Sequence, residues 1–174
     1  MLPRLTLVLG GAASGKSRYG EGLVRAASRR RVYLATAEAY DDEMRAKIAR
    51  HRDMRAADGW TTIEAPLDLV PALGAVRSDQ AVLLDCATLW LSNHMLAGHD
   101  MRDAETALMT ALTACAAPVV VVSNEVGLSV VPENALARQF QRAQGELNQR
   151  LAGDAGLVVQ VIAGLPRTLK GTLS

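Results

Sequence analysis

The chain has 174 residues, of which 49% are hydrophobic and 21% are charged, and its formal net charge is +1. These proportions are those of ordinary globular proteins, so they exclude wholesale disorder. The charge is close to neutral and the one dense basic run, Arg29–Arg31, is short, which argues against a nucleic-acid-binding protein. No apolar stretch approaches the ~20 residues that a membrane helix needs, so no membrane span is expected.

Length and cysteine usage indicate one compact domain, residues 1–174, in a reducing compartment. A chain of this length folds most economically around a single core. Cys86 and Cys115 lack the spacing of a zinc site or a disulfide framework and stand beside apolar residues, so both are expected to be buried, free thiols. Residues 1–9 lack the form of a cleavable signal. We therefore predict a cytoplasmic protein.

Predicted strands and helices alternate along the chain. In chain order the pattern predicts a strand at 5–9, a helix at 16–28, a strand at 31–36, a helix at 41–55, a short extended segment at 60–65, a strand at 81–85, a helix at 104–116, a strand at 118–123, a helix at 134–151 and a strand at 157–162. The basic run Arg29–Arg31 would end the first helix, where cations suit the helix dipole. Most strands are apolar throughout, which is typical of a parallel sheet between helices. The expected fold is a single-domain α/β fold with a mostly parallel sheet flanked by helices.

The connection between the first strand and the first helix carries a complete phosphate-binding motif, G-x-x-x-x-G-K-S. The glycines let backbone N–H groups turn toward phosphate oxygens, and the following helix N-terminus adds partial positive charge. Lys16 is expected to hold the β- and γ-phosphates of a nucleotide, and Ser17 to bind Mg²⁺. The residues of this loop are Gly10, Gly11, Ala12, Ala13, Ser14, Gly15, Lys16 and Ser17. The motif predicts a P-loop nucleotide-binding enzyme.

Asp85 ends the apolar segment 81–85, as the second acidic element of P-loop enzymes ends a buried strand. Alternatively, it is an ordinary cap at the end of a strand. The functional interpretation places its carboxylate near Mg²⁺ or the nucleotide. These features indicate a nucleotide and a metal, and they do not identify the group that is phosphorylated.

His51 lies on the inward face of a predicted helix. When the segment 41–55 is projected as a helix, Met44, Ile48, His51 and Arg55 fall on one stripe. His51 is then either a half-buried structural histidine or a neutral imidazole nucleophile whose neighbouring arginines steady nucleotide phosphates. Spacing does not decide between these two interpretations.

Ordered segments along nearly the whole chain together resemble one enzyme family. They are Gly10–Ser17, Tyr33–Ala37, Asp41–Met44 with Ile48 and His51–Arg52, Trp60–Glu64, Leu83–Cys86, Thr88–Asn93, Val122–Gly127, Val131–Glu133, Arg138, Phe140, Gly145, Asn148–Gln149, Gly164–Pro166 and Lys170. The most specific is Val-Ser-Asn-Glu-Val-Gly at 122–127. With these segments the chain resembles the bifunctional adenosylcobinamide kinase/adenosylcobinamide-phosphate guanylyltransferase family of cobalamin biosynthesis.

The resemblance implies two reactions at one nucleotide site. The first phosphorylates the aminopropanol hydroxyl of adenosylcobinamide with ATP or GTP. The second transfers GMP from GTP to adenosylcobinamide phosphate through a guanylylated histidine, giving adenosylcobinamide-GDP and pyrophosphate. His51 stands at the motif position of that histidine. A neutral imidazole is a competent nucleophile toward the α-phosphorus.

The resemblance also implies the contacts of the nucleotide and of the divalent cation. The nucleotide would bind the loop from Gly10 to Ser17 together with Ala35, Thr36, Ala37, Arg52, Asp53, Met54, Arg55, Glu64 and Asp85. Glu64 would accept hydrogen bonds from guanine N–H groups, although a surface acid on a strand is its ordinary interpretation. Ser17 and Asp85 would hold Mg²⁺. The family is trimeric, so a homo-oligomer is expected.

Two residues depart from the family pattern. Ser129 stands where the family usually has the second glycine of a turn, which restricts the backbone there. Arg142 stands in a segment where relatives often carry Asp, at a position expected to face the corrinoid or a neighbouring subunit. The remaining histidines, His94 and His99, have no cysteine or acid at ligand spacing, so both are expected on the surface.

Two other functions remain open from the residues alone. A simple P-loop kinase of another small alcohol would use the same loop, with His51 merely structural. A GTP-binding regulatory module would bind the nucleotide without chemistry. The ordered match, which includes His51 and Glu64 beyond the P-loop, favours the bifunctional enzyme.

Overall fold

The computed structural model describes residues 1–38, 49, 53 and 55–172. The strands are β1 (Leu5–Gly10), β2 (Arg31–Ala35), β3 (Trp60–Glu64), β4 (Ala81–Asp85), β5 (Val119–Asn124), β6 (Leu157–Ile162) and β7 (Leu165–Lys170). The described helices are α1 (Lys16–Ala27), α3 (Val70–Gly74), α4 (Ala87–Leu96), α5 (Met101–Ala114) and α6 (Ala135–Asp154).

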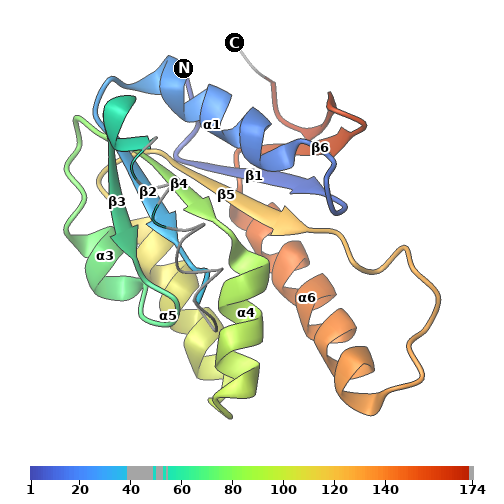
Figure 1. The fold of residues 1–174 in the computed structure, drawn as a ribbon. Helices are drawn as coiled ribbons and strands as arrows, with labels where there is room; N and C mark the ends of the chain where they lie inside the picture. Colours follow the sequence, from blue (N-terminus) through green and yellow to red (C-terminus); the bar gives the residue numbers. More distant parts are fainter. Residues whose placement is uncertain (39–48, 50–52, 54, 173–174) are drawn as a thin grey trace.

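The seven strands of the described chain form one sheet in the order β3-β2-β4-β5-β1-β6-β7. All neighbours are parallel except β6 and β7, which run antiparallel. Helix α1 covers one face, and α3, α4, α5 and α6 cover the other (Figure 1). An apolar core lies on each face, and consecutive strand residues such as Val121 and Val122 enter opposite cores. The predicted α/β class, with its mostly parallel and helix-flanked sheet, is confirmed.

The strand order places the carboxyl ends of several parallel strands side by side at one edge of the sheet. Strands β2, β4, β5 and β1 are consecutive neighbours and parallel, so their carboxyl ends open on the same side. The P-loop follows β1 at this edge, and Asp85 and Asn124 are the last residues of β4 and β5. Ligands of open α/β sheets bind outside the carboxyl ends of the strands, so a ligand is expected at this edge.

The structure adds three elements to the predicted pattern and moves the ends of others. α3, α4 and β7 have no counterpart in the prediction. α5 begins at Met101 rather than at residue 104, because the Asp100 carboxylate caps it by accepting hydrogen bonds from the backbone N–H groups of Arg102 and Asp103. α6 continues to Asp154. The helix predicted at 41–55 lies largely outside the described residues.

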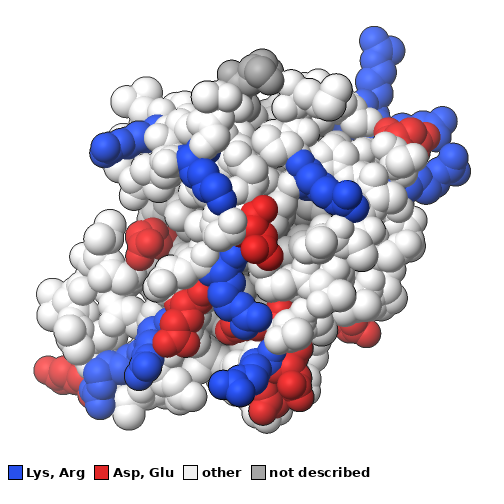
Figure 2. All heavy atoms as spheres, turned by 180° about the vertical axis from the view of Figure 1, so that it is seen from behind, with Lys and Arg blue, Asp and Glu red and all other residues white. Residues whose placement is uncertain are grey.

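Charges of both signs are intermingled on the face turned away from the view of Figure 1, as Figure 2 shows. The basic run follows α1 instead of ending it: Arg30 lies in the turn and Arg31 begins β2. Arg30 pairs with Asp79 at 2.6 Å. Within the described ranges, none of the helices has the length and apolar character to cross a membrane.

Candidate active site

The P-loop joins β1 to α1 as a tight turn. Ala13 and Gly15 have φ angles of 54° and 90°, and Gly15 is the N-cap of α1. Gly10 has no room for a side chain, because a Cβ there would overlap Ser14 Oγ and lie 2.7 Å from Val161 O. Left-handed residues followed by a helix N-terminus form a backbone arrangement that binds anions. The local geometry therefore agrees with the phosphate-binding role that the motif predicts.

The β6–β7 hairpin supports the P-loop from the side. Its two-residue turn, Ala163 and Gly164, has φ angles of 52° and 79°, as a turn of the primed type requires. The Gly164 N–H donates a hydrogen bond to Ser14 O at 2.8 Å. A Cβ on Gly15 would lie 3.3 Å from Gly164 Cα, so the two backbones are in close contact. The turn that leads into β7 thus helps to hold the P-loop in place, although the residues of β7 itself are exposed.

Helix α1 approaches the sheet closely enough to bring Ser17 to a strand that is not adjacent to β1. Strand β5 separates β1 from β4. Gly20 is buried on α1, where a Cβ would lie 3.1 Å from a side-chain carbon of Leu83 and 3.2 Å from one of Val122. The absence of a side chain at Gly20 permits this close packing. Ser17 Oγ consequently donates to Asp85 Oδ1 at 3.3 Å.

Asp85 is held by a second donor, Tyr33 of β2. The Tyr33 hydroxyl donates to Asp85 Oδ2 at 2.7 Å. Burial, and then the adjacent Asp85 carboxylate, raise the pKa of the Tyr33 phenol, so it keeps its proton and remains the donor. With Ser17 at one oxygen and Tyr33 at the other, the carboxylate has a fixed orientation beside the P-loop.

Tyr33 has no predicted role, because no motif marks it as a partner of Asp85. Period-two alternation in β2 was a usable signal, because it places Tyr33 and Ala35 on the same face of the sheet, the face that α1 covers. That alternation predicts the face and the strand. It does not predict the contact with Asp85, which depends on β2 and β4 being neighbours.

Lys16 is half-buried at the start of α1. Its Nζ donates to Gly11 O at 3.0 Å, so the ammonium group lies against its own loop. The ammonium group thus lies beside the P-loop, which in this motif binds the β- and γ-phosphates of the nucleotide. The structure therefore brings Lys16, Ser17 and Asp85 to one small region.

Arg55, four residues after His51 in the sequence, contacts this region. Its guanidinium carbon lies 3.6 Å from the centroid of the Tyr33 ring, a cation–π contact. Arg55 Nε is buried and has no hydrogen-bond partner within the described part of the chain. Asp53 is described and exposed. His51, Arg52 and Met54 lie outside the described residues, so their predicted roles stay predictions.

The contacts predicted at the ends of β2 and β3 lie at the same edge of the sheet. Ala35 stands in register with Glu64 on one side and Asp85 on the other. Thr36 is fully buried, and its hydroxyl donates to Cys86 O and accepts from Cys86 N, both at 2.8 Å. Its side chain therefore fixes the connection after β4. Ala37 is half-buried and Glu64 is exposed.

The oxygen atoms of Ser17 and Asp85 fit a magnesium ion bound together with a nucleotide. A hydroxyl and a carboxylate are hard oxygen ligands, and Mg²⁺ usually takes only one or two protein ligands beside water and phosphate. In the described ranges no three His, Cys, Asp or Glu residues form a metal-ligating group. The donor set thus suits a cation that completes its coordination with phosphate and water.

The prediction that His94 lies on the surface is wrong. It is half-buried on α4, where its ring lies 4.6 Å from that of Trp90, centroid to centroid. His94 Nε2 is 3.0 Å from Leu67 O, and its Nδ1 is 3.0 Å from Nδ1 of the exposed His99. The prediction failed for His94 because α4, which buries Trp90, was not predicted.

Both departures from the family pattern are accommodated by local bonds. Ser129 does not have a positive φ. Its hydroxyl donates to Val126 O at 3.0 Å and accepts from Gln141 Nε2 at 3.2 Å, which ties the β5–α6 connection to α6. Arg142 is exposed on α6 and pairs with Glu146 one turn later, at 2.9 Å.

Known proteins similar to this chain belong to a nucleotide-using enzyme family, as its P-loop would suggest. The family model described as cobinamide kinase / cobinamide phosphate guanyltransferase matches residues 6–169. The chain is 42% identical to the bifunctional adenosylcobalamin biosynthesis protein CobP of Pseudomonas aeruginosa, over 95% of this chain and 96% of the relative. It is 39% identical to the bifunctional adenosylcobalamin biosynthesis protein CobU of Salmonella typhimurium, over 95% and 99% of the two chains.

Among solved structures, a prototypical ATPase from the type III secretion system of pathogenic bacteria shares the fold. The TM-score is 0.51 at 8% identity, and the match covers 96% of this chain and 57% of the ATPase chain. A likeness at this identity concerns the fold alone. The family match and the two full-length relatives carry the assignment: the chain belongs to the cobinamide kinase / cobinamide phosphate guanyltransferase family.

Proposed function

We propose that this enzyme catalyses two successive transfers at its P-loop. The first is phosphorylation of adenosylcobinamide by ATP or GTP. The second is transfer of GMP from GTP to adenosylcobinamide phosphate, which yields adenosylcobinamide-GDP and pyrophosphate. The observation that carries the proposal is the family match over residues 6–169. The names of the relatives, which are bifunctional adenosylcobalamin biosynthesis proteins, support it.

In the first transfer, the substrate hydroxyl oxygen attacks the γ-phosphorus. The bond from that phosphorus to the β,γ-bridging oxygen breaks, ADP or GDP leaves, and the hydroxyl proton passes to solvent. Lys16 would neutralise charge on the β- and γ-phosphates, a role that its position against Gly11 O supports. The N-terminus of α1 adds to the positive potential. Mg²⁺, held by Ser17 and Asp85, would supply further charge neutralisation.

In the second transfer, a ring nitrogen of His51 attacks the α-phosphorus of GTP and pyrophosphate leaves as the α,β-bridging bond breaks. An oxygen of adenosylcobinamide phosphate then attacks the same phosphorus. The P–N bond breaks and His51 is restored. The same loop would hold the two phosphates that leave, which explains why one site can serve both reactions.

Residues around the P-loop would bind the rest of the nucleotide. Glu64 would accept hydrogen bonds from guanine, and its place beside Ala35 at the carboxyl edge of the sheet supports this role. The segment from Arg52 to Arg55 would contact the phosphates. Stacking of Arg55 on Tyr33 supports this, because it brings a cation to the residue that orients Asp85.

Two differently labelled preparations of GTP test the proposal. With γ-labelled GTP and adenosylcobinamide, the enzyme should form labelled adenosylcobinamide phosphate. With α-labelled GTP and adenosylcobinamide phosphate, the label should appear in adenosylcobinamide-GDP. Transfer of the γ-phosphate alone would indicate the simple P-loop kinase instead. Binding of GTP without either transfer would indicate a regulatory module.

We also infer that the chain acts as one domain, residues 1–174, in a cytoplasmic homo-oligomer that is trimeric by family resemblance. Cys86 and Cys115 are buried and free, as predicted, which suits a reducing compartment. Leu128, Val130 and Val131 are at least 71% exposed, and a subunit contact would remove them from water. Sedimentation equilibrium should give the mass of a trimer, and a monomer mass would contradict the inference.

A further inference from the structure

The turn between α4 and α5 brings two histidines into contact. α4 ends in a Schellman motif, in which the His99 N–H donates to His94 O and the Gly98 N–H donates to Met95 O, both at 3.1 Å. Gly98, with a φ angle of 70°, supplies the left-handed residue that the motif needs. The side chains of the two outer residues of such a motif commonly touch, and both are usually apolar. Here both are imidazoles, with ring centroids 5.0 Å apart.

His94 is fixed in its position and in its tautomer. Its ring packs against the buried Trp90, and its Nε2 lies 3.0 Å from Leu67 O, which also accepts from Trp90 Nε1 at 2.8 Å. A carbonyl oxygen only accepts, so His94 Nε2 carries a proton and Nδ1 of the neutral ring has the lone pair. Histidines that bind metals typically donate their other N–H to a backbone carbonyl or a carboxylate in this way. His94 therefore has the arrangement of a metal ligand that coordinates through Nδ1.

His99 brings a second ring nitrogen to the same point. Its Nδ1 is 3.0 Å from His94 Nδ1, and because His94 Nδ1 accepts, His99 Nδ1 carries the proton between them. His99 is exposed, so its ring can turn and its proton can move to Nε2, which directs both lone pairs at one point. The two rings line a cavity of about 180 Å³ together with Asp68, whose carboxylate favours a cation there. The cavity also has room for water beside an ion.

We propose that His94 and His99 together bind one divalent transition-metal ion through their Nδ1 atoms, with water as the remaining ligands. With metal–nitrogen bonds of about 2.1 Å, nitrogens 3.0 Å apart subtend an angle of about 90° at the metal. Adjacent ligands of a square-planar or octahedral ion are about 90° apart, whereas tetrahedral Zn²⁺ requires about 109°. The pair therefore suits Ni²⁺ or Cu²⁺, for which imidazole is a favourable ligand.

This site differs from the proposed magnesium site in place and in chemistry. It lies at the end of α4, on the face of the sheet opposite to α1, and it offers nitrogen rather than oxygen ligands (Figure 1). A bound ion would hold the end of α4 to the turn that precedes α5, and it would stabilise the folded chain by mass action. The inference does not depend on the two proposed transfers.

Equilibrium titration of the untagged full chain with Ni²⁺, followed by calorimetry, tests the site. Excess Mg²⁺ is included to occupy the oxygen ligands Ser17 and Asp85, which suit a harder cation. The parent should bind one equivalent of Ni²⁺, and His99→Ala should bind it at least about tenfold more weakly, because losing a ligand costs no less than losing an outer-shell partner. Ni²⁺ should also raise the Tm of the parent and not that of His99→Ala. His99 is exposed and the Schellman bonds join backbone groups, so this variant should fold like the parent.

His51→Ala is the matched control, because the chain has three histidines and this variant removes the one outside the pair. It should bind Ni²⁺ with the parental affinity and stoichiometry. His94→Gln removes the other proposed ligand and should weaken binding as His99→Ala does. Absence of Ni²⁺ binding by the parent, or parental affinity in either variant of the pair, would overturn the proposal, and so would weaker binding in His51→Ala. Because the assay contains neither nucleotide nor corrinoid, failure of the proposed function would leave these results unaffected.

Discussion

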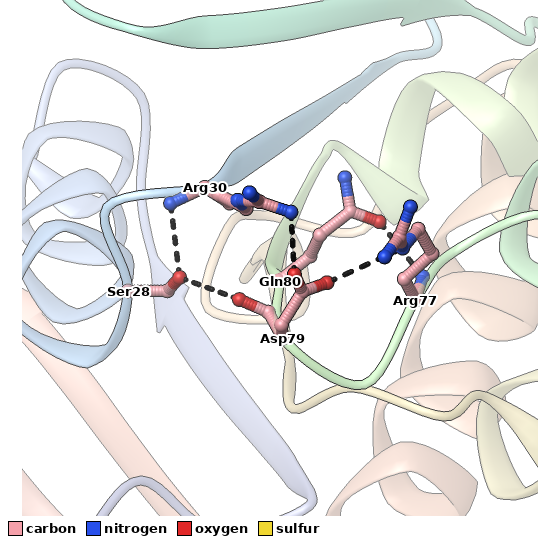
Figure 3. A network of polar contacts seen from close by, with 5 residues as sticks. All are labelled: Ser28, Arg30, Arg77, Asp79 and Gln80. Atoms are coloured by element: carbon pink, nitrogen blue, oxygen red, sulfur yellow. Dashed lines mark hydrogen bonds and ion pairs between the residues drawn. The ribbon is translucent and has the colours of Figure 1, made fainter.

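At the amino ends of β2 and β4, polar groups bond to one another, whereas at the opposite edge, beside the P-loop, two buried side-chain oxygens have no hydrogen bond from a described residue. Figure 3 shows the first region, where Asp79 lies between two arginines. Its carboxylate is 2.6 Å from Arg30 Nη1 and 3.5 Å from Arg77 Nε. Ser28 Oγ donates to Asp79 O and accepts from Arg30 N, both at 3.0 Å, while Gln80 Oε1 accepts from Arg77 N at 2.7 Å.

The carboxyl edge has the opposite character. Ser14 Oγ and Asn124 Oδ1 are both buried there without a hydrogen bond from any described residue. Among the described residues, the Lys16 ammonium donates to Gly11 O, a carbonyl of its own loop. Polar groups that satisfy one another connect elements of the fold, and unsatisfied ones beside a P-loop are available to a ligand. We therefore propose that the amino end of the sheet contributes to stability and that the carboxyl end binds the nucleotide.

The largest expected effect comes from Lys16→Ala at the carboxyl edge. The side chain neutralises phosphate charge in both proposed transfers, so both rates should fall about 10²- to 10³-fold. Lys16 is only half-buried and bonds within its own loop, so Tm should change little. Steady-state assays of each transfer and a thermal melt measure the two quantities. Parental phosphorylation of adenosylcobinamide would contradict a shared site.

A smaller effect is expected from Tyr33→Phe. The variant removes the donor to Asp85 Oδ2 and keeps the ring that packs under Arg55. Residues that orient a metal ligand typically change metal affinity or activity by about tenfold to a hundredfold. The activity should therefore need more Mg²⁺ for half-saturation, as a titration at fixed GTP would reveal. Parental Mg²⁺ dependence would mean that Asp85 does not rely on Tyr33.

Asp79→Ala at the amino edge should have the smallest effect, and on stability alone. Exposed ion pairs contribute about 0.2–1 kcal/mol each, and Asp79 takes part in two. For a chain of this size a loss of about 1 kcal/mol lowers Tm by about 2–4 °C. Both transfer rates, measured well below Tm, should equal those of the parent. Loss of activity in this variant would contradict the assignment of stability and of nucleotide binding to opposite ends of the sheet.

Much of the fold follows from local patterns in the sequence. Apolar runs between turns predicted the parallel strands other than β3 closely, because buried parallel strands need no alternation. At β3 the sequence predicted only a short extended segment, since Trp60–Glu64 is not apolar throughout. α4 escaped prediction because its apolar residues, including Trp90 and Leu91, are buried on several sides and show no helical stripe. β7 escaped because its residues are exposed and its turn uses Ala163 at positive φ, where Asn or Asp is the usual signal.

The sequence could propose those candidate site residues that belong to a local motif. The P-loop motif and the acid that ends a strand predicted Gly10–Ser17 and Asp85. The Tyr33–Asp85 bond required the strand order, which sequence spacing does not contain.

The most direct test of two transfers at one site is covalent labelling of the protein by GTP labelled at the α-phosphorus. The parent should acquire an acid-labile, base-stable adduct, as a phosphoramidate should be, on the peptide that contains His51. His51→Ala should form no adduct and lose GMP transfer while it keeps measurable kinase activity. His99→Ala, which alters an exposed histidine, should label like the parent. An adduct that persists in His51→Ala would contradict the account, and equal loss of both activities in that variant would assign His51 a structural role.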